Sequence, residues 1–148
     1  MRKMILISQT ELSAGMDFIE AGLSEFEIGK KQKLKTMLVA EESLQKLIMH
    51  AESVEEKICI ALNKKMGSAY LSMSLRGQTF ELIQGDTVED VLHREQDDQQ
   101  TSHEKEEEMI RDILLRANKD QLRYKNKKGT NIVEITVRKN PHAMVMRT

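Results

Sequence analysis

The stretch KKQKLKTMLVAEESLQKLIMHAE, residues 30–52, decides how the rest of the chain is arranged. Its apolar residues recur at the three- and four-residue spacing of one helical stripe, which predicts a helix packed against a core. They are Leu34, Met37, Leu38, Leu44, Leu47, Ile48 and Ala51. Glu42, Lys46 and His50 lie four residues apart. At about 100° per residue their mean direction is nearly opposite the stripe, so we expect the helix to display a polar row.

Length and composition predict a single domain over residues 1–148. A chain of 148 residues can bury about two-thirds of its unfolded surface. The 23 basic and 24 acidic residues nearly cancel, which excludes a strong overall field toward nucleic acid or an anionic membrane. No apolar run has the length of a signal peptide or a membrane span, so we expect a cytoplasmic protein. The one cysteine, Cys59, lies in an apolar run and is expected to be a buried, inert thiol.

The residues before the central stretch predict a strand followed by a helix. Lys3 to Gln9 alternates weakly, and Ser8 and Glu11 have the spacing of a helix capping box. The apolar face of the following helix is formed by Met16, Ile19, Leu23 and Phe26. Gly29 is a plausible stop, so we expect two consecutive helices after the first strand.

Residues 56–84 change to a period of two, which predicts antiparallel strands covered on one face. The apolar set of this pattern is Ile58, Ile60, Leu62, Ala69, Leu71, Met73, Leu75, Phe80 and Leu82. Residues 85–108 are the most polar part of the chain and are interpreted as a charged, flexible excursion. It contains His93 and His103, whose spacing fits no compact metal site, so we expect no metal there.

The end of the chain predicts one more helix and one more strand. Ile110, Ile113, Leu114 and Ala117 indicate a helix running to about Gln121. Val133, Ile135 and Val137 indicate a final strand. The expected fold class is therefore α+β, a two-layer sandwich with helices packed on one face of a mixed, mainly antiparallel sheet.

The motifs of the central helix resemble those of the GHKL (Bergerat-fold, histidine-kinase-like) ATPases, above all the anti-sigma-factor serine kinases of bacteria. The helix reads Glu42, Lys46, His50-Ala51, where the family has Glu, then Asn four residues later, then commonly His-Ala. The resemblance implies that Glu42 is the residue that positions water for attack on the γ-phosphate. Lys46 stands where the family has the Asn that holds Mg²⁺, and a cation does not suit a metal that takes oxygen ligands.

Two later motifs extend the resemblance over residues 3–139. In LRGQTFEL, Gly77 matches the family glycine, while Leu75 stands where the family has the Asp that binds the adenine amino group. Leu cannot accept that hydrogen bond. Asp120, Tyr124, Gly129 and Asn131 match the D-x-x-x-Y…N pattern near the end. The lid glycines of the family fall near Met109 and Arg111, in an acidic surrounding that would repel a triphosphate.

The resemblance therefore implies a degenerate ATPase-fold domain acting as a regulatory, protein-binding signalling module with a protein partner. The alternative is an active ATP-binding serine kinase, with Glu42 as the base, Mg-ATP as the cofactor, and Lys46, His50, Leu75, Gly77 and Asn131 around the nucleotide. The sequence leaves a homodimer open. A basic cluster of Arg123, Lys125, Lys127, Lys128, Arg138 and Lys139 is interpreted as solvated edge charge rather than a nucleic-acid site.

Overall fold

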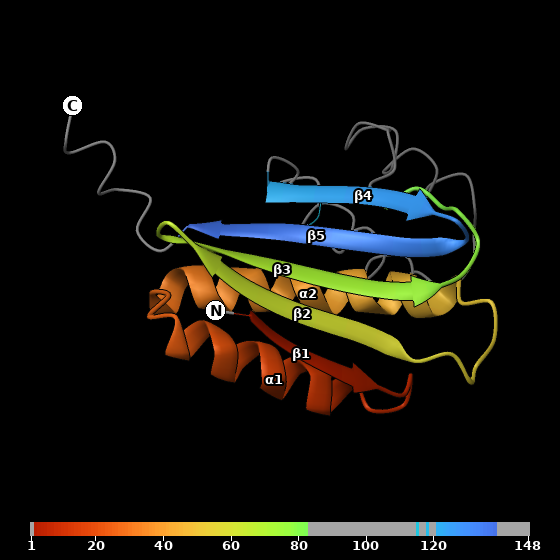
Figure 1. The fold of residues 1–148 in the computed structure, drawn as a ribbon, viewed down its shortest axis with the longest axis horizontal. Helices are drawn as coiled ribbons and strands as arrows, with labels where there is room; N and C mark the ends of the chain where they lie inside the picture. The colour runs from red at the N-terminus through yellow and green to blue at the C-terminus, as the bar shows by residue number, and fades with distance from the viewer. Residues whose placement is uncertain (1, 83–114, 116–117, 119–120, 139–148) are drawn as a thin grey trace, which may run out of the picture.

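The computed structural model describes residues 2–82, 115, 118 and 121–138 (Figure 1). The elements begin with β1 (Arg2–Ile7), α1 (Leu12–Glu25) and α2 (Lys30–Met49). They continue with β2 (Ile58–Lys65), β3 (Ser68–Arg76), β4 (Leu122–Lys127) and β5 (Thr130–Arg138). The strands form one sheet in the order β1-β2-β3-β5-β4. Every strand pair in the described part of the chain is antiparallel, so the sheet is antiparallel rather than mixed.

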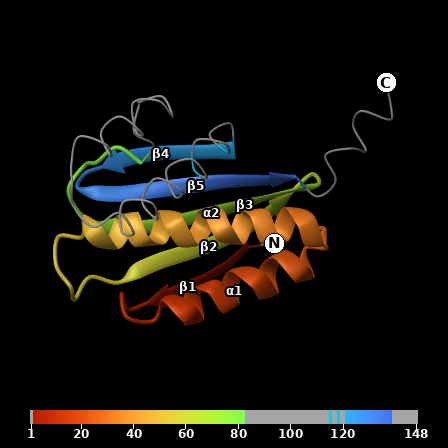
Figure 2. The same ribbon diagram turned by 180° about the vertical axis from the view of Figure 1, so that it is seen from behind.

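The two helices lie side by side on one face of this sheet (Figure 2). Helix α1 packs over β1 and β2, and α2 packs over β3 and β5. The opposite face of the sheet, seen in Figure 1, has no described helix against it. The predicted α+β sandwich is confirmed. No helix within the described ranges is both long and apolar enough to cross a membrane.

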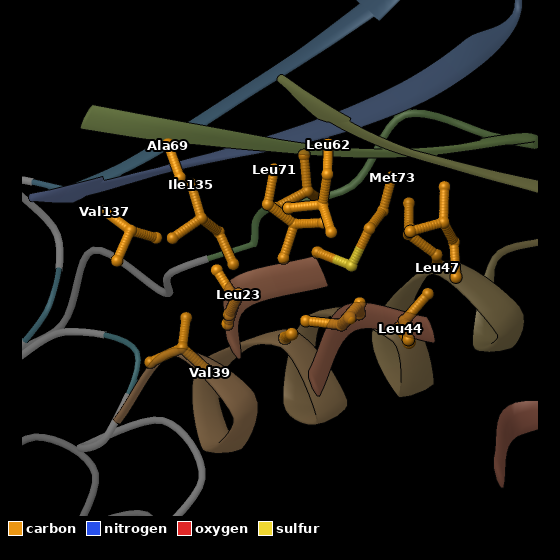
Figure 3. Close-up of a cluster of buried hydrophobic side chains, with 14 of the residues drawn as sticks. Leu23, Val39, Leu44, Leu47, Leu62, Ala69, Leu71, Met73, Ile135 and Val137 are labelled. Atoms are coloured by element: carbon orange, nitrogen blue, oxygen red, sulfur yellow. The ribbon is translucent and has the colours of Figure 1, made fainter. Parts of the chain in front are cut away.

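The core lies between the helices and the inward-facing residues of the three central strands (Figure 3). The predicted alternation is confirmed, because Ile58, Ile60 and Leu62 of β2 and the apolar residues of β3 are all buried. The strand register places them in rows across the sheet, such as Leu62, Leu71 and Ile135. The alternation does not continue to Phe80 and Leu82 as strand, because β3 ends at Arg76.

The buried side of α2 differs from the predicted stripe. Leu34 and Leu38 are 62% and 45% exposed, whereas Val39, Ala40 and Ser43 are buried with Leu44 and Leu47. Small side chains let the helix approach the sheet closely. The buried hydroxyls of Thr36 and Ser43 bond to the carbonyls of Gln32 and Val39, four residues earlier, at 2.8 Å each. A polar residue can therefore lie on the core side of a helix, which a hydropathy pattern does not indicate.

Helix α1 follows its prediction closely. Ile19, Leu23 and Phe26 are buried, and Gly22 lies against Leu62, so that an added Cβ would be 2.3 Å from the Leu62 Cδ1 atom. The predicted capping box forms only in part. The Glu11 carboxylate accepts a hydrogen bond from the Ser8 amide at 2.9 Å, but the helix begins at Leu12 and has no side-chain cap.

The C-terminal hairpin contains a strand that the sequence pattern did not reveal. β4 pairs with β5 at the edge of the sheet, and its outward residues include Arg123 and Lys125. β4 was missed because its sequence, LRYKNK, contains little apolar alternation. The predicted excursion at 85–108 and most of the predicted helix at 110–121 lie outside the described residues; Leu115 is described and is buried. Cys59 is half-buried on the open face of the sheet, so the expectation of a buried thiol is wrong.

Candidate functional site

The polar row of the central stretch lies near the end of α2 and is not a solvated face. α2 ends at Met49 and His50 is its C-terminal cap residue, so His50 lies just outside the helix. Glu42, Lys46 and His50 are all half-buried, and the Oε2 atom of Glu42 is inaccessible to water. The three side chains are therefore partly covered by the protein rather than fully exposed.

The end of α2 is joined to the chain after β3 by backbone contacts. Ala51 and Gly77 form an isolated antiparallel bridge. The Gln78 amide donates to the His50 carbonyl at 3.0 Å, and the Gly77 amide donates to the Gly129 carbonyl at 3.0 Å. Gly77 lies so close to the chain that an added Cβ would be 2.1 Å from the His50 carbonyl oxygen. A residue with any side chain cannot occupy this position without moving the backbone.

Three aromatic side chains from distant parts of the sequence stack at this junction. The His50 and Phe80 rings are parallel within 7°, with centroids 4.3 Å apart. The Phe80 ring also contacts Tyr124 of β4, with centroids 4.8 Å apart at an angle of 44°. The Tyr124 hydroxyl accepts a hydrogen bond from the Phe80 amide at 3.1 Å. The stack fixes the segment after β3 between the end of α2 and the edge strand.

Asn131 is the buried polar centre of the same region. Its Nδ2 donates to the Gln78 carbonyl at 2.8 Å. Its Oδ1 accepts from the Tyr124 hydroxyl and, at 2.8 Å, from the Asn126 side chain. Asn126 also donates to the Gly77 carbonyl at 3.3 Å. The amide of Asn131 is thus satisfied by the chain itself, as a fully buried polar group must be.

Leu75 lies beside Asn131 in the sheet. The two residues are register partners of β3 and β5, and both face the helices. Leu75 is 1% exposed and belongs to the hydrophobic core. An alkyl side chain in a closed core offers no hydrogen-bond acceptor to a ligand.

Tertiary structure brings together four of the six residues singled out in the sequence. His50, Leu75, Gly77 and Asn131 lie in one cluster, and α2 carries Lys46 one turn before His50. Glu42 lies one turn earlier still on α2. Sequence reasoning noted Phe80 and Tyr124 but did not assign them to the site, and it missed Asn126. The signal for Asn126 was its place two residues after Tyr124 in an alternating segment, which puts both on the same side of a strand.

Comparisons with known proteins find similarity among solved structures, but none among family models or curated proteins. No family model matches this chain, and no curated protein matches it. Among solved structures, the catalytic domain of the histidine kinase ThkA, in a nucleotide-free form, is similar with a TM-score of 0.48 and 12% sequence identity. The match covers 95% of this chain and 98% of that one. At this level of similarity, the residues of this chain alone decide what the site can do.

The chemistry open to these residues is limited by their charge and burial. Mg²⁺ takes oxygen ligands, and α2 presents an ammonium group, Lys46, one turn after the Glu42 carboxylate. No group of three or more His, Cys, Asp or Glu side chains is arranged to hold a metal ion within residues 2–82, 115, 118 and 121–138. The positions of Met109 and Arg111, which the family resemblance assigns to the lid, lie outside the described residues.

Proposed function

We propose that this chain is a degenerate histidine-kinase-like ATPase-fold domain that acts as a regulatory, protein-binding signalling module, in the manner of an anti-sigma factor. The observation that carries the proposal is that the side chains of Leu75 and Asn131 make their contacts within the protein. Leu75 is buried in the core, and the side-chain amide of Asn131 is hydrogen-bonded to Gln78, Tyr124 and Asn126. Groups already bonded within the protein would have to lose those bonds before they could bind a nucleotide.

A protein-binding role is supported by the open face of the sheet. Met4 and Leu6 of β1 and Tyr70 of β3 are exposed there, at 60%, 64% and 42%. Between them lie small side chains in register, with Ala61 opposite Ser72 and Cys59 opposite Ser74. Exposed apolar side chains around a floor of small residues form a surface suited to a protein partner.

A Mg-ATP titration followed by thermal unfolding tests the nucleotide part of the proposal. A ligand that binds only the folded state stabilises it by RT ln(1 + [L]/Kd), about 2.7 kcal/mol at a hundredfold excess over Kd. We expect no rise in melting temperature at millimolar Mg-ATP. We also expect none for Lys46→Asn, because Leu75 and Asn131 remain as they are. A rise in the unmodified chain would contradict the proposal and favour the active serine kinase, for which the retained Glu42 carboxylate is the supporting observation.

Affinity capture with matched variants tests the partner surface. Leu6→Glu places a charge on the open face, whereas Met66→Glu places one on the β2–β3 turn, where Met66 is fully exposed. We expect a partner that is retained by the unmodified chain and by Met66→Glu and is lost with Leu6→Glu. Equal recovery with both variants would show that the open face is not the binding surface.

A further inference from the structure

A groove lies between α1 and α2, the two helices that lie side by side in Figure 2. The groove has a volume of about 750 Å³ and is lined by five apolar side chains of the two helices and by the polar or charged residues Ser13, Glu20, Lys30, Lys33 and Glu41. Leu12 and Met16 come from α1, and Leu34, Met37 and Leu38 come from α2. This surface is separate from the open face of the sheet and from the Asn131 cluster.

The exposed side of α2 bears a seam typical of contact with another helix. Lys31, Leu34, Leu38 and Glu41 follow one another at spacings of three, four and three, which keeps them on one side of a helix. Leu34 is 62% exposed and Leu38 is 45% exposed, and both line the groove. Two large apolar side chains exposed one turn apart on a helix beside a groove indicate a surface that a partner helix covers.

These four residues are arranged evenly on either side of position 36 in the sequence: the two leucines match each other, and the two charged residues have opposite charges. Leu34 and Leu38 lie two positions on either side of Thr36, and Lys31 and Glu41 lie five positions on either side. If a second α2 is placed antiparallel across the seam, each Leu34 meets Leu38 of the other copy, and each Lys31 meets Glu41. A parallel arrangement would instead place like charges together. Only the antiparallel arrangement is complementary in both apolar shape and charge.

We propose that the groove is occupied by α2 of a second copy of this chain, related by a two-fold axis that passes between the two helices at the level of Thr36 along each helix. A two-fold interface uses one patch on both subunits, so the patch must be complementary to itself, and this seam meets that condition. Leu34 and Leu38 of each copy enter the groove of the other, and two Lys31–Glu41 pairs flank them. The inference is independent of the proposed function, because it uses neither the nucleotide-site residues nor the open face.

Charge reversal tests the pairing directly. Lys31 and Glu41 are ten residues apart, about 15 Å along the helix, so they do not pair within one chain. We expect sedimentation equilibrium to show a dimer for the unmodified chain. Lys31→Glu and Glu41→Lys should each weaken the dimer by about tenfold, because each variant sets like charges against one another twice. Circular dichroism melting checks that both variants fold.

A mixture of the two variants provides the decisive measurement. In a mixed dimer, Glu at position 31 of one chain meets Lys at position 41 of the other, and the second pair joins native Glu41 to native Lys31. The mixture should therefore dimerise about as strongly as the unmodified chain, although neither variant does so alone. The proposal is overturned if the unmodified chain is monomeric at about 1 mM, if neither variant weakens a dimer, or if the mixture shows no recovery. If Glu41→Lys does not fold, Leu38→Lys replaces it as the weakening variant, and unchanged dimerisation would overturn the proposal.

Discussion

The His50 ring lies parallel to the Phe80 ring, with 4.3 Å between the ring centroids. The two residues are thirty positions apart, and the contact joins the cap residue of α2 to the segment that follows β3. Tyr124 continues the stack to the edge strand β4. The aromatic contact and the Asn131 hydrogen bonds therefore hold together a junction that the strand ladder alone does not close.

Truncation of Phe80 tests how much the aromatic stack contributes. Phe80→Ala removes the ring that contacts both His50 and Tyr124. Because Phe80 is only half-buried, we expect the free energy of unfolding to fall by about 2 kcal/mol, below the range for a fully buried ring. Phe80→Leu keeps apolar volume and should lose about 1 kcal/mol. Urea unfolding measures both, and a loss under about 0.5 kcal/mol for Phe80→Ala would show that the stack does not stabilise the fold.

Asn131 should be the most sensitive polar residue of the junction. Asn131→Ala leaves the Gln78 carbonyl and the Tyr124 and Asn126 side chains without their partner. The variant removes three hydrogen bonds of an amide that is fully buried, and at about 1 kcal/mol for each bond we expect a total loss of about 3 kcal/mol. Asn126→Ala is the matched control, because Asn126 is half-buried and water can replace it; about 1 kcal/mol is expected. Similar losses for the two variants in chemical unfolding would argue against a buried network centred on Asn131.

Gly77 and Gly22 both lie in close contact with another part of the chain, Gly77 with backbone and Gly22 with a side chain. The Cβ of Gly77→Ala would lie 2.1 Å from the His50 carbonyl oxygen, whereas that of Gly22→Ala would meet the terminal methyl of Leu62. The end of the Leu62 side chain can move by a change of its side-chain torsion angles, but the His50 carbonyl is fixed by its hydrogen bond from the Gln78 amide. We expect Gly77→Ala to lose about 3 kcal/mol and Gly22→Ala about 1 kcal/mol or less, since alanine also favours the helix. Thermal unfolding of the two variants shows which of them loses more stability. A larger loss for Gly22→Ala than for Gly77→Ala would be inconsistent with the Ala51–Gly77 bridge.

We expect the contribution of Glu11, at the start of α1, to the stability of the protein to depend on pH. The hydrogen bond from the Ser8 amide to its carboxylate lowers the pKa of Glu11 below the ordinary 4.5. A group whose pKa is lower in the folded state stabilises the protein fully above its unfolded pKa, and this contribution is lost as the pH falls through the folded pKa. The stability difference between the unmodified chain and Glu11→Gln should therefore shrink as the pH is lowered below 4.5. Urea midpoints measured across that range check this, and a constant or growing difference would contradict it.

Much of the fold could be predicted from the sequence. The alternation in β2 and β3 and the helical spacing in α1 are strong because each element buries one side only, and the structure confirms the buried residues. The helix position at residues 30–49 also agreed with the pattern. β4 was not predicted, because an edge strand faces water along one side and keeps charged residues such as Arg123 and Lys125.

The candidate site was only partly accessible to sequence reasoning. Motif spacing pointed to His50, Leu75, Gly77 and Asn131, and these residues do lie together. Their contacts could not be predicted, because the stack of His50, Phe80 and Tyr124 depends on the crossing of three segments.

The sequence by itself determined that residues 30–49 are helix and that β2 and β3 are strands, since the spacing of apolar residues differs between a helix and a strand. Only the tertiary structure decided which side of α2 faces inward. Val39, Ala40 and Ser43 are buried while Leu34 and Leu38 remain exposed. The physical reason is that close helix–sheet packing selects small side chains and bonded hydroxyls, a choice made by the neighbouring elements and not by hydropathy.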